Sequence, residues 1–537
     1  MFDKIIIYFL TLSCILLLQA SNLQANDDKY LVIHIDGISS ELFAAELEAG
    51  NLNNLKETFR DKGMIEHGIT YFPPSTQVVI SRIREAKGIE EAPLLDWAKF
   101  DEDEKNKKGK IGVYGKMRDT ISRRPTTNFA YGYPLLSNLA GPALLNTPDL
   151  IDKYGIVEFY WFNTDTYAHI WGEEVQVRKL REFDNYFGAV VDDLSDNVNI
   201  IIYSDHGMSF GETINLDSKV YNFFEEDILK YAYPNLYLDN SSNKFKVAQK
   251  LIEQTPLTYT FVKNDSNEII GYHQNGQVIF KEKSGRVKYL YKGEDPFNYY
   301  NNGYQGEYLT SEQWMELTYQ LEYPLTPIRI NDLFKHPNVG DIVTVLNPPK
   351  IIGGLYTESG NHHGLTAQDM TVPVLLSGPD LEHLYDYDYL SLDQLFEKTD
   401  TIDFHDIEPD REEHSLSIKA AEIDDNENRT IKSKFEFSPA YRFKLGGERM
   451  SDSYQAWGLY DLYSTYLSRL WLGAGLKYQE RIKPIAKIKY QLKVRNAGLK
   501  YSYSSVKQGN LNLFYQLTSN LDLKLYGLTS FGFRYSW

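Results

Sequence analysis

The sequence predicts an α/β protein whose mostly parallel sheet is sandwiched by helices, followed by an all-β barrel of about eight strands. Apolar runs such as residues 30–35 and 198–203 alternate with helical patterns from residue 30 to about residue 379. Unbroken apolar runs are typical of parallel strands that helices cover on both faces. Beyond about residue 430, apolar and polar residues alternate strictly, as in residues 487–495. That alternation indicates strands with one apolar and one polar face.

Length and charge limit the possible functions. A chain of 537 residues exceeds one ordinary domain, so two or three domains are expected. The hydrophobic content of 42% together with 24% charged residues is that of a folded protein. A formal net charge of -18 argues against binding to a nucleic-acid duplex, because phosphate backbones require a basic surface.

The first 25 residues are interpreted as a signal peptide. Lys4 precedes an apolar run over residues 5–18 and a small or polar stretch over residues 19–25. The apolar run is shorter than the roughly 20 residues that a membrane-spanning helix needs, so export with cleavage is preferred to a transmembrane anchor. The single cysteine, Cys14, lies in this segment. The mature protein would therefore hold any metal with histidines and carboxylates.

Domain boundaries follow from changes in composition. The catalytic α/β domain is predicted over residues 26–380, with an inserted cap at about residues 212–340 that is rich in Tyr, Asn and Phe. A loosely ordered surface excursion is the alternative interpretation of this insertion. The acidic residues 381–430 are interpreted as a linker.

Residues 431–537 are predicted to form the β-barrel. Their alternating segments end on Phe531, Phe533, Tyr535 and Trp537, and the tail resembles a small outer-membrane barrel. With an even number of strands both barrel ends would lie on the periplasmic side, and so would the catalytic domain. A soluble β-sandwich is the alternative, because alternation also marks half-buried strands.

Ionisable side chains follow the predicted strands of the α/β domain. Such groups are expensive to bury without a partner, so their repeated placement at strand ends indicates a common site. One pair is spaced four residues apart, which brings both side chains to one face of a helical turn. Three carboxylates and three imidazoles form a ligand set suited to two zinc ions. The candidate ligands are Asp36, Asp165, His169, Asp205, His206 and His363.

Thr76 is the candidate nucleophile. It follows Pro73 and Pro74 and precedes an apolar helical pattern, as a plain helix N-cap also would. The N-terminus of a helix stabilises an incoming anion, so a hydroxyl group there can face a phosphate.

Taken together, these motifs resemble the alkaline phosphatase superfamily, and most closely its nucleotide pyrophosphatase and phosphodiesterase branch. The resemblance covers about residues 30–380 and implies an alkaline phosphatase-like fold. It implies that one metal is held by Asp36, Asp205 and His206 and also binds the Thr76 oxygen. The second metal would be held by Asp165, His169 and His363. The motifs are Asp36-Gly37, Pro74-Ser75-Thr76, Asp165 to His169 with Gly172, Asp205-His206-Gly207 and His363-Gly364.

The function expected from this resemblance is hydrolysis of a small phosphate-ester substrate, as a phosphodiesterase or nucleotide pyrophosphatase. The reaction would pass through a phosphothreonine intermediate and use two divalent metal ions, of which zinc is the first candidate. Family members that cleave diesters carry an Asn where residues 88–92 here read Gly-Ile-Glu-Glu-Ala. Arg82 or Arg84 could replace that phosphate contact, but surface positions are the preferred expectation for both. A phosphomonoesterase therefore stays open, as does a non-catalytic envelope protein with a phosphatase-like domain. A sulfatase is disfavoured because the segment around Thr76 lacks its C/S-x-P-x-R pattern.

Overall fold

The computed structural model describes residues 29–536 with internal gaps. The gaps are residues 86–94, 96–98, 102–105, 109–126, 129–139, 225–227, 240–242, 355–358, 400–414, 424–428, 441–442, 451–452, 465–467, 496, 506, 519–520 and 527–529. The predicted signal peptide and residues 88–92 lie outside the described residues.

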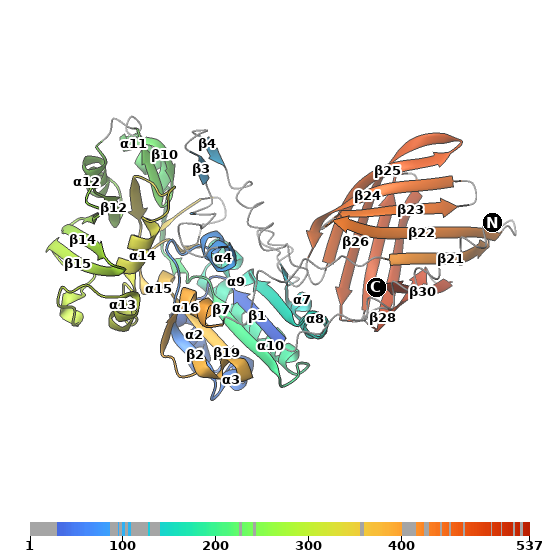
Figure 1. Cartoon of the computed structure of the whole chain (residues 1–537), viewed down its shortest axis with the longest axis horizontal. Coiled ribbons are helices and arrows are strands. Elements are labelled where there is room, and N and C mark those ends of the chain that lie inside the picture. The colour runs from blue at the N-terminus through green and yellow to red at the C-terminus, as the bar shows by residue number, and fades with distance from the viewer. Residues whose placement is uncertain are drawn as a thin grey trace.

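The first domain is built on a seven-stranded sheet in the order β20-β2-β19-β7-β1-β6-β5 (Figure 1). Neighbouring strands run parallel except β19, which is antiparallel to both β2 and β7. The mostly parallel sheet predicted from the apolar runs is thus confirmed. Its strands are β1 (Lys29–Ile35), β2 (Gly63–Ile69), β5 (Thr127–Asn128), β6 (Ile156–Trp161), β7 (Val198–Ser204), β19 (Thr371–Ser377) and β20 (Tyr389–Ser391).

Helices cover both faces of this sheet because successive residues of β1 point to opposite sides. Leu31 and Ile33 pack against α2 (Ser40–Glu48), α3 (Asn53–Phe59), α7 (Ala140–Leu144), α8 (Thr147–Tyr154) and α10 (Glu173–Val191). Tyr30 and Val32 belong to a second apolar cluster with α4 (Thr76–Glu85), η4 (Pro379–Leu384) and α16 (Leu392–Lys398). Among the described residues, no helix is long and apolar enough to cross a membrane.

The predicted insertion is an ordered domain with its own core. Seven antiparallel strands pair in the order β10-β11-β16-β12-β13-β14-β15. Tyr289, Tyr299 and Trp314 are fully buried in its aromatic core. The interpretation as a loosely ordered excursion is therefore wrong. The elements are α11 (Leu216–Phe224), β10 (Ile228–Ala232), β11 (Asn235–Leu238), α12 (Lys244–Gln254), β12 (Tyr259–Lys263), β13 (Ile269–His273), β14 (Gly276–Lys283), β15 (Arg286–Gly293), η3 (Tyr300–Asn302), α13 (Ser311–Thr318), α14 (Thr326–Leu333) and β16 (Ile342–Val345).

Short strand pairs join the segments on either side of this insertion. Strand β8 (Ser209–Phe210) pairs with β18 (Gly360–Asn361), and β9 (Glu212–Ile214) pairs with β17 (Lys350–Ile352). The first pair brings the loop after residue 361 next to the exit of β7. A third pair joins β3 (Lys99–Asp101) and β4 (Asn106–Lys108), and α15 (Ala367–Met370) precedes β19.

The structure corrects the prediction that residues 381–430 form a linker. Its first part contains η4, β20 and α16, and β20 pairs with β2 in the core sheet. Leu390, Leu392 and Leu395 are fully buried, so this segment completes the catalytic domain despite its acidic composition. Residues 400–414 lie outside the described residues.

The C-terminal strands form a closed antiparallel barrel, visible at the right of Figure 1. Each strand pairs with the next, and β21 closes on β30 through Ser415↔Ser536 and Leu416↔Tyr535. The barrel has ten strands and begins at residue 415, rather than about eight beginning at residue 431. The strands are β21 (Ser415–Ile423), β22 (Arg429–Ala440), β23 (Phe443–Met450), β24 (Ser453–Ser464), β25 (Ser468–Gln479), β26 (Arg481–Val494), β27 (Ala497–Ser504), β28 (Lys507–Thr518), β29 (Leu521–Tyr526) and β30 (Ser530–Ser536).

Residues at the end of β26 join the barrel to the first domain. Leu492 and Val494 pack against the apolar cluster beneath α10. The Arg495 guanidinium lies 2.6 Å from Asp193 Oδ2, and the Asn146 side chain donates to the carbonyl of Lys493 at 3.1 Å. Because the strands alternate in direction, this end of β26 is also the end where β21 begins and β30 finishes.

Candidate functional site

Asp36, Asp165 and Asp205 lie at the same edge of the core sheet because each comes after one of three parallel strands. Ile35 at the end of β1 pairs with Trp161 of β6 and with Ser204 of β7. Asp36 and Asp205 directly follow these strand ends, where open α/β sheets bind their ligands. Gly37 has a φ of +73°, and a Cβ atom there would lie 3.0 Å from the Cβ of Asp165. The close approach of Asp165 therefore requires glycine at this position.

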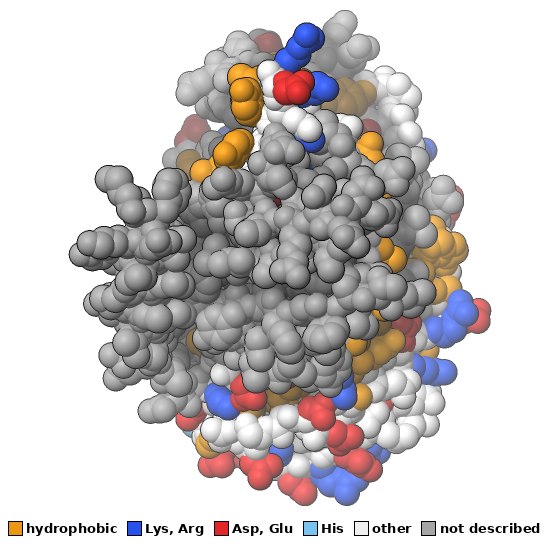
Figure 2. Space-filling view, turned by 90° about the vertical axis from the view of Figure 1, so that its right-hand side faces the viewer, with side chains coloured by type: hydrophobic (Ala, Val, Ile, Leu, Met, Phe, Trp, Pro, Cys, Tyr) orange, Lys and Arg blue, Asp and Glu red, His pale blue; other side chains and the backbone are white. Residues whose placement is uncertain are grey.

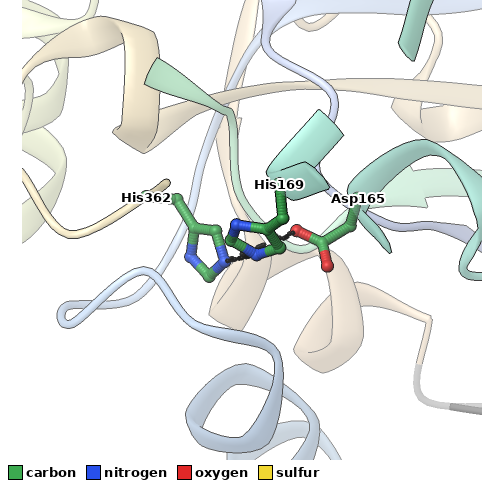
Figure 3. A group of neighbouring side chains, drawn as sticks. All are labelled: Asp165, His169 and His362. Atoms are coloured by element: carbon green, nitrogen blue, oxygen red, sulfur yellow. Dashed lines mark hydrogen bonds and ion pairs between the residues drawn. The ribbon is translucent and has the colours of Figure 1, made fainter. Parts of the chain in front are cut away.

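Helix α9 (Asn163–Trp171) supplies the next pair of ligands. Asp165 and His169 are one turn apart, and Asp165 Oδ1 lies 3.1 Å from His169 Nε2 (Figure 3). The hydroxyl of Thr164 donates to the carbonyl of Asp36, which fixes the helix to the end of β1.

The loop after β18 contributes His362. Its Nε2 lies 3.3 Å from His169 Nε2 and 3.5 Å from Asp165 Oδ1 (Figure 3). Its ring stacks on the ring of His206 with 3.5 Å between the centroids. Asp369 anchors this loop, since its carboxylate accepts hydrogen bonds from the backbone N–H groups of His363 and Gly364 and from a serine hydroxyl.

His363 is not part of this ligand group, which corrects the sequence prediction. Its ring lies 4.9 Å from the ring of Tyr233 in the inserted domain, and the Tyr233 hydroxyl donates to the His363 carbonyl. Adjacent residues of a turn point their side chains in different directions, so only one of His362 and His363 reaches the ligand group. The pairing of β8 with β18 and the hydrogen bonds from Asp369 determine which one, and neither can be seen in the local sequence.

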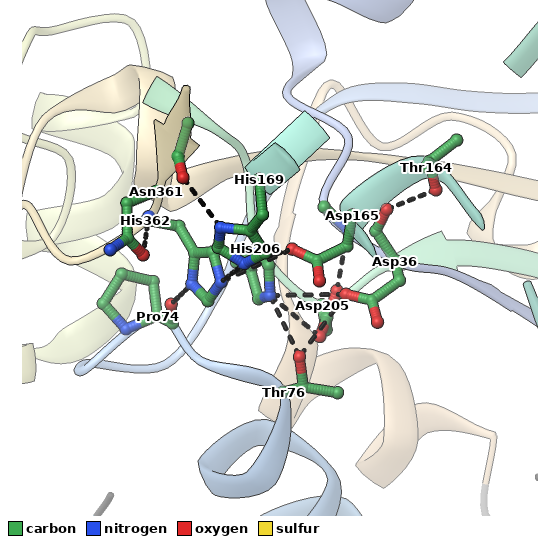
Figure 4. Close-up of polar contacts among 12 residues, drawn as sticks. Asp36, Pro74, Thr76, Thr164, Asp165, His169, Asp205, His206, Asn361 and His362 are labelled. Atoms are coloured by element: carbon green, nitrogen blue, oxygen red, sulfur yellow. Dashed lines mark hydrogen bonds and ion pairs between the residues drawn. The ribbon is translucent and has the colours of Figure 1, made fainter. Parts of the chain in front are cut away.

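Thr76 lies among these ligands at the start of α4. Its Oγ1 is 3.1 Å from His206 Nε2 and 3.4 Å from Asp36 Oδ1 (Figure 4). The side chain is fully buried. Every predicted site residue other than His363 is therefore brought together in one place.

The three imidazoles share one hydrogen-bonding arrangement. In each ring Nδ1 faces a backbone carbonyl oxygen, which can only accept, so Nδ1 donates there and Nε2 is the nitrogen directed into the site. When the rings are neutral, the Nε2 atoms of His169 and His362 offer lone pairs that face each other, an arrangement that a bound cation would stabilise. The distances are 2.8 Å from His206 to Gly207 O, 2.7 Å from His169 to Gly360 O and 2.6 Å from His362 to Pro74 O.

The carboxylates at this site lack cationic partners. Among the described residues, the ion pairs of Asp36, Asp165 and Asp205 all involve histidines. Burial, and then repulsion from Asp205 and Asp165, raises the pKa of Asp36 well above its ordinary value. Burial alone would also raise the pKa of Asp205, but attraction to His206 and His34 holds that pKa below its ordinary value. Within the described part of the chain, Asp36 Oδ2 and Asp205 Oδ2 have no hydrogen-bond partner. Carboxylate oxygens beside imidazole nitrogens form a ligand set that fits divalent cations.

The sequence reasoning missed His34. Its Nε2 lies 3.0 Å from Asp205 Oδ1, and with Asp36 and Asp205 it forms one of the clusters able to hold a metal. Residues two apart on a strand share a face, so the position of His34 two residues before Asp36 could have predicted that both side chains lie near the site. The other clusters are Asp165 with His169 and His362, and Asp36 with Asp165 and His206.

The sequence offers Arg82 as a possible phosphate contact. Its guanidinium lies 3.9 Å from the centroid of the Tyr71 ring, and Arg329 lies 5.2 Å from the same ring. Arg329 also forms a 2.8 Å ion pair with Asp393. Arg82 thus belongs to a cluster that joins the insertion to the core. The side chain of Arg84 lies outside the described residues.

Comparisons with known proteins give a family match and similar solved structures. Residues 69–348 match the family described as type I phosphodiesterase / nucleotide pyrophosphatase. No curated protein matches the chain. One similar solved structure is murine ectonucleotide pyrophosphatase / phosphodiesterase 5, with 13% identity, a TM-score of 0.46, and coverage of 70% of this chain and 95% of that chain. Another is phosphonoacetate hydrolase from Sinorhizobium meliloti, with 11% identity, a TM-score of 0.40, and coverage of 65% and 90%.

The adjacent histidines give a direct test of the site. We expect His362→Ala to weaken binding of a divalent metal by at least about tenfold, because it removes an Nε2 lone pair from the cluster. His363→Ala is the matched control and should bind metal as the parent does. Zinc titration of metal-free protein against a chromogenic chelator measures both variants. The opposite ranking would restore His363 as the ligand.

Metal binding should also strengthen as the pH rises. Because its pKa is raised, Asp36 keeps its proton to higher pH than an ordinary aspartate, and a metal must displace that proton. Burial, and then repulsion from neighbouring histidines, lowers the pKa of His362, so its proton competes only in stronger acid. Protonation of Asp36 stabilises the metal-free fold at low pH, and this stabilisation is lost as the pH rises through the raised pKa. The increase in melting temperature on adding zinc should therefore be larger at about pH 8 than at about pH 5; an equal or smaller increase would contradict this.

Proposed function

Because the chain belongs to the type I phosphodiesterase / nucleotide pyrophosphatase family, we propose that it hydrolyses phosphate esters with Thr76 as the nucleophile and two divalent metal ions as cofactors. The observation that carries the proposal is the convergence of buried histidine and aspartate side chains around the Thr76 hydroxyl (Figure 4). A non-catalytic ligand-binding domain would not need a hydroxyl at the centre of such a cluster.

Two groups of side chains would hold the ions. Asp36, Asp205 and His206 surround the Thr76 oxygen, and the other group is Asp165, His169 and His362. Zinc is the preferred metal, because histidine and carboxylate ligands without thiolates are usual in catalytic zinc sites. When bound, such ions lower the pKa of a hydroxyl group and neutralise charge on the phosphate.

The chain's own residues account for the covalent steps. The Thr76 hydroxyl donates to Asp36 Oδ1, so this carboxylate is placed to receive its proton. Thr76 Oγ1 then forms a bond to phosphorus, and the bond from phosphorus to the leaving oxygen breaks. Thr76 begins α4, and the positive end of the helix dipole there would stabilise the phosphate. Water finally cleaves the phosphothreonine, which releases the second product and restores the hydroxyl.

Diester hydrolysis is the preferred activity because of the family, and hydrolysis of a phosphomonoester is the alternative. The Asn of the diesterase pattern is missing from residues 88–92, which leaves the monoester possible. A diester substrate such as thymidine 5′-p-nitrophenyl phosphate should therefore be cleaved faster than p-nitrophenyl phosphate.

Replacement of the nucleophile tests the mechanism. Thr76→Ala should lower kcat/KM by at least about 10³-fold, since no other group can form the covalent intermediate. Thr76→Ser keeps a hydroxyl and should retain measurable activity. Ser75→Ala is the matched control, because the Ser75 hydroxyl is buried beside Thr76 and has no hydrogen-bond partner among the residues that the structure describes. Both substrates would be assayed for each variant. Full activity in Thr76→Ala would exclude the proposed nucleophile.

We further propose that the protein is exported and anchored in an outer membrane by its barrel, with the catalytic domain on the periplasmic side. The support is an outward-facing set of exposed apolar side chains on β24–β28, alternating with more buried residues. Figure 2 looks onto the barrel side, and hydrophobic side chains lie along its right flank. The exposed set is Tyr454, Tyr460, Leu472, Leu476, Tyr478, Ile482, Ile488, Tyr501, Tyr503, Leu511 and Leu513.

The inward side of the same strands differs in character. Trp457 and Trp471 are almost fully buried, and Lys487 Nζ lies 3.0 Å from the centroid of the Trp457 ring. Buried Gln455, Asp461 and Lys489 lie on the inward side together with this tryptophan cluster. Polar inward residues with apolar outward residues are the arrangement of membrane barrels. The first domain contacts the end of the barrel at which β21 begins and β30 finishes. This contact supports placing the first domain on the periplasmic side.

A charge on the outer barrel face tests the anchor. Leu472→Arg, near the middle of β25, should reduce the amount of folded protein that sediments with membranes and resists alkaline extraction, because a cation facing lipid costs about 2–4 kcal/mol near the midplane. Lys477→Arg, on the inward side of the same strand, should leave sedimentation unchanged. Recovery of the parent protein in the soluble periplasmic fraction would contradict the anchor.

A further inference from the structure

His34 is a buried histidine that the proposed reaction does not use. It lies in the middle of the core sheet on β1, and only 1% of its surface is exposed. Its register partners on the two flanking strands are Tyr160 and Tyr203. The Tyr203 ring stacks on it at 5.1 Å, the Tyr160 ring meets it edge-on at 4.9 Å, and the Phe162 ring lies at 6.2 Å.

Packing alone does not explain a histidine at this position. A polar ring placed among aromatic side chains loses its hydration, whereas an apolar residue of similar size would fill the same space without that loss. In the described part of the chain, neither His34 ring nitrogen has a partner with full hydrogen-bond geometry, but Nε2 lies 3.0 Å from Asp205 Oδ1 as an ion-pair contact. The carboxylate contact is therefore the one polar interaction that the ring makes there.

Because of this contact, the two carboxylate oxygens of Asp205 have different surroundings. Oδ1 faces His34 Nε2 and accepts the backbone N–H of Gly37 at 3.2 Å. Oδ2 lies 3.3 Å from His206 Nε2 and has no hydrogen-bond partner among the described residues. The Gly37 N–H and the His34 ring on one oxygen restrict the rotation of the carboxylate and leave the other oxygen available for a ligand.

We propose that His34 is a positioning residue, which holds Asp205 Oδ1 so that Oδ2 is presented to the divalent metal beside Thr76. The aromatic rings around His34 restrict the imidazole to one orientation, and the imidazole restricts the carboxylate. This inference rests on the proposed two-metal function and adds to it a residue outside the ligand set.

Two nearly isosteric substitutions separate positioning from packing. His34→Gln keeps an N–H donor, and His34→Met fills a similar volume without one. We expect His34→Met to weaken one of the two zinc sites by about 10- to 100-fold, and His34→Gln to recover most of that loss. The measurement is zinc titration of the full-length metal-free protein in competition with a chelator, accompanied by kcat and KM at saturating zinc. At saturating zinc, kcat of His34→Met should approach that of the parent.

Controls keep this inference distinct from the proposed function. His67→Met is the matched control, because His67 also packs edge-on against an aromatic ring, that of Tyr319, and it should leave zinc affinity unchanged. His34→Phe replaces His34→Met if the latter does not fold. Equal zinc affinity in the Met and Gln variants would overturn the role of His34. Failure of the parent protein to bind two zinc ions would instead overturn the proposed function.

Discussion

Three buried carboxylates that meet without a lysine or arginine partner in the described chain set the main constraint on this structure. Asp36, Asp165 and Asp205 reach one edge of the sheet because β1, β6 and β7 run parallel and end at the same level. Burial, and then repulsion from Asp205 and Asp165, raises the pKa of Asp36. The Nδ1 protons of the three imidazoles point to backbone carbonyls, away from the carboxylates. A bound cation would offset the repulsion.

The sequence was most informative where chemistry follows a buried strand. Asp36 and Asp205 could be identified because each follows an apolar run, and the helical spacing of Asp165 and His169 placed both on one face. The choice between His362 and His363 could not be made. It depends on the β8–β18 pair and on the anchoring carboxylate of Asp369, which are contacts between segments remote in sequence.

Composition was a weaker guide than periodicity for the domain boundaries. The acidic segment after residue 380 looked like a linker, yet Leu390 and Leu395 are buried in the core. In the barrel, the strand count was low partly because glycines interrupt the alternation. Gly446 and Gly475 lie against Trp457, where a Cβ atom would approach the Trp457 side chain within about 2.7 Å or less. A missing side chain can therefore mark a packed position instead of a strand end.

The two halves of the site are physically linked, so they act as one unit. The His362 Nδ1 proton is donated to the carbonyl of Pro74, two residues before the nucleophile, and the His362 ring stacks on His206. His206 in turn contacts Thr76 Oγ1. A shift of the loop after β18 would move the Pro74–Thr76 turn and one ligand of each proposed metal together. The loop that carries His362 also holds His363 against Tyr233, so the inserted domain bears directly on the position of the nucleophile.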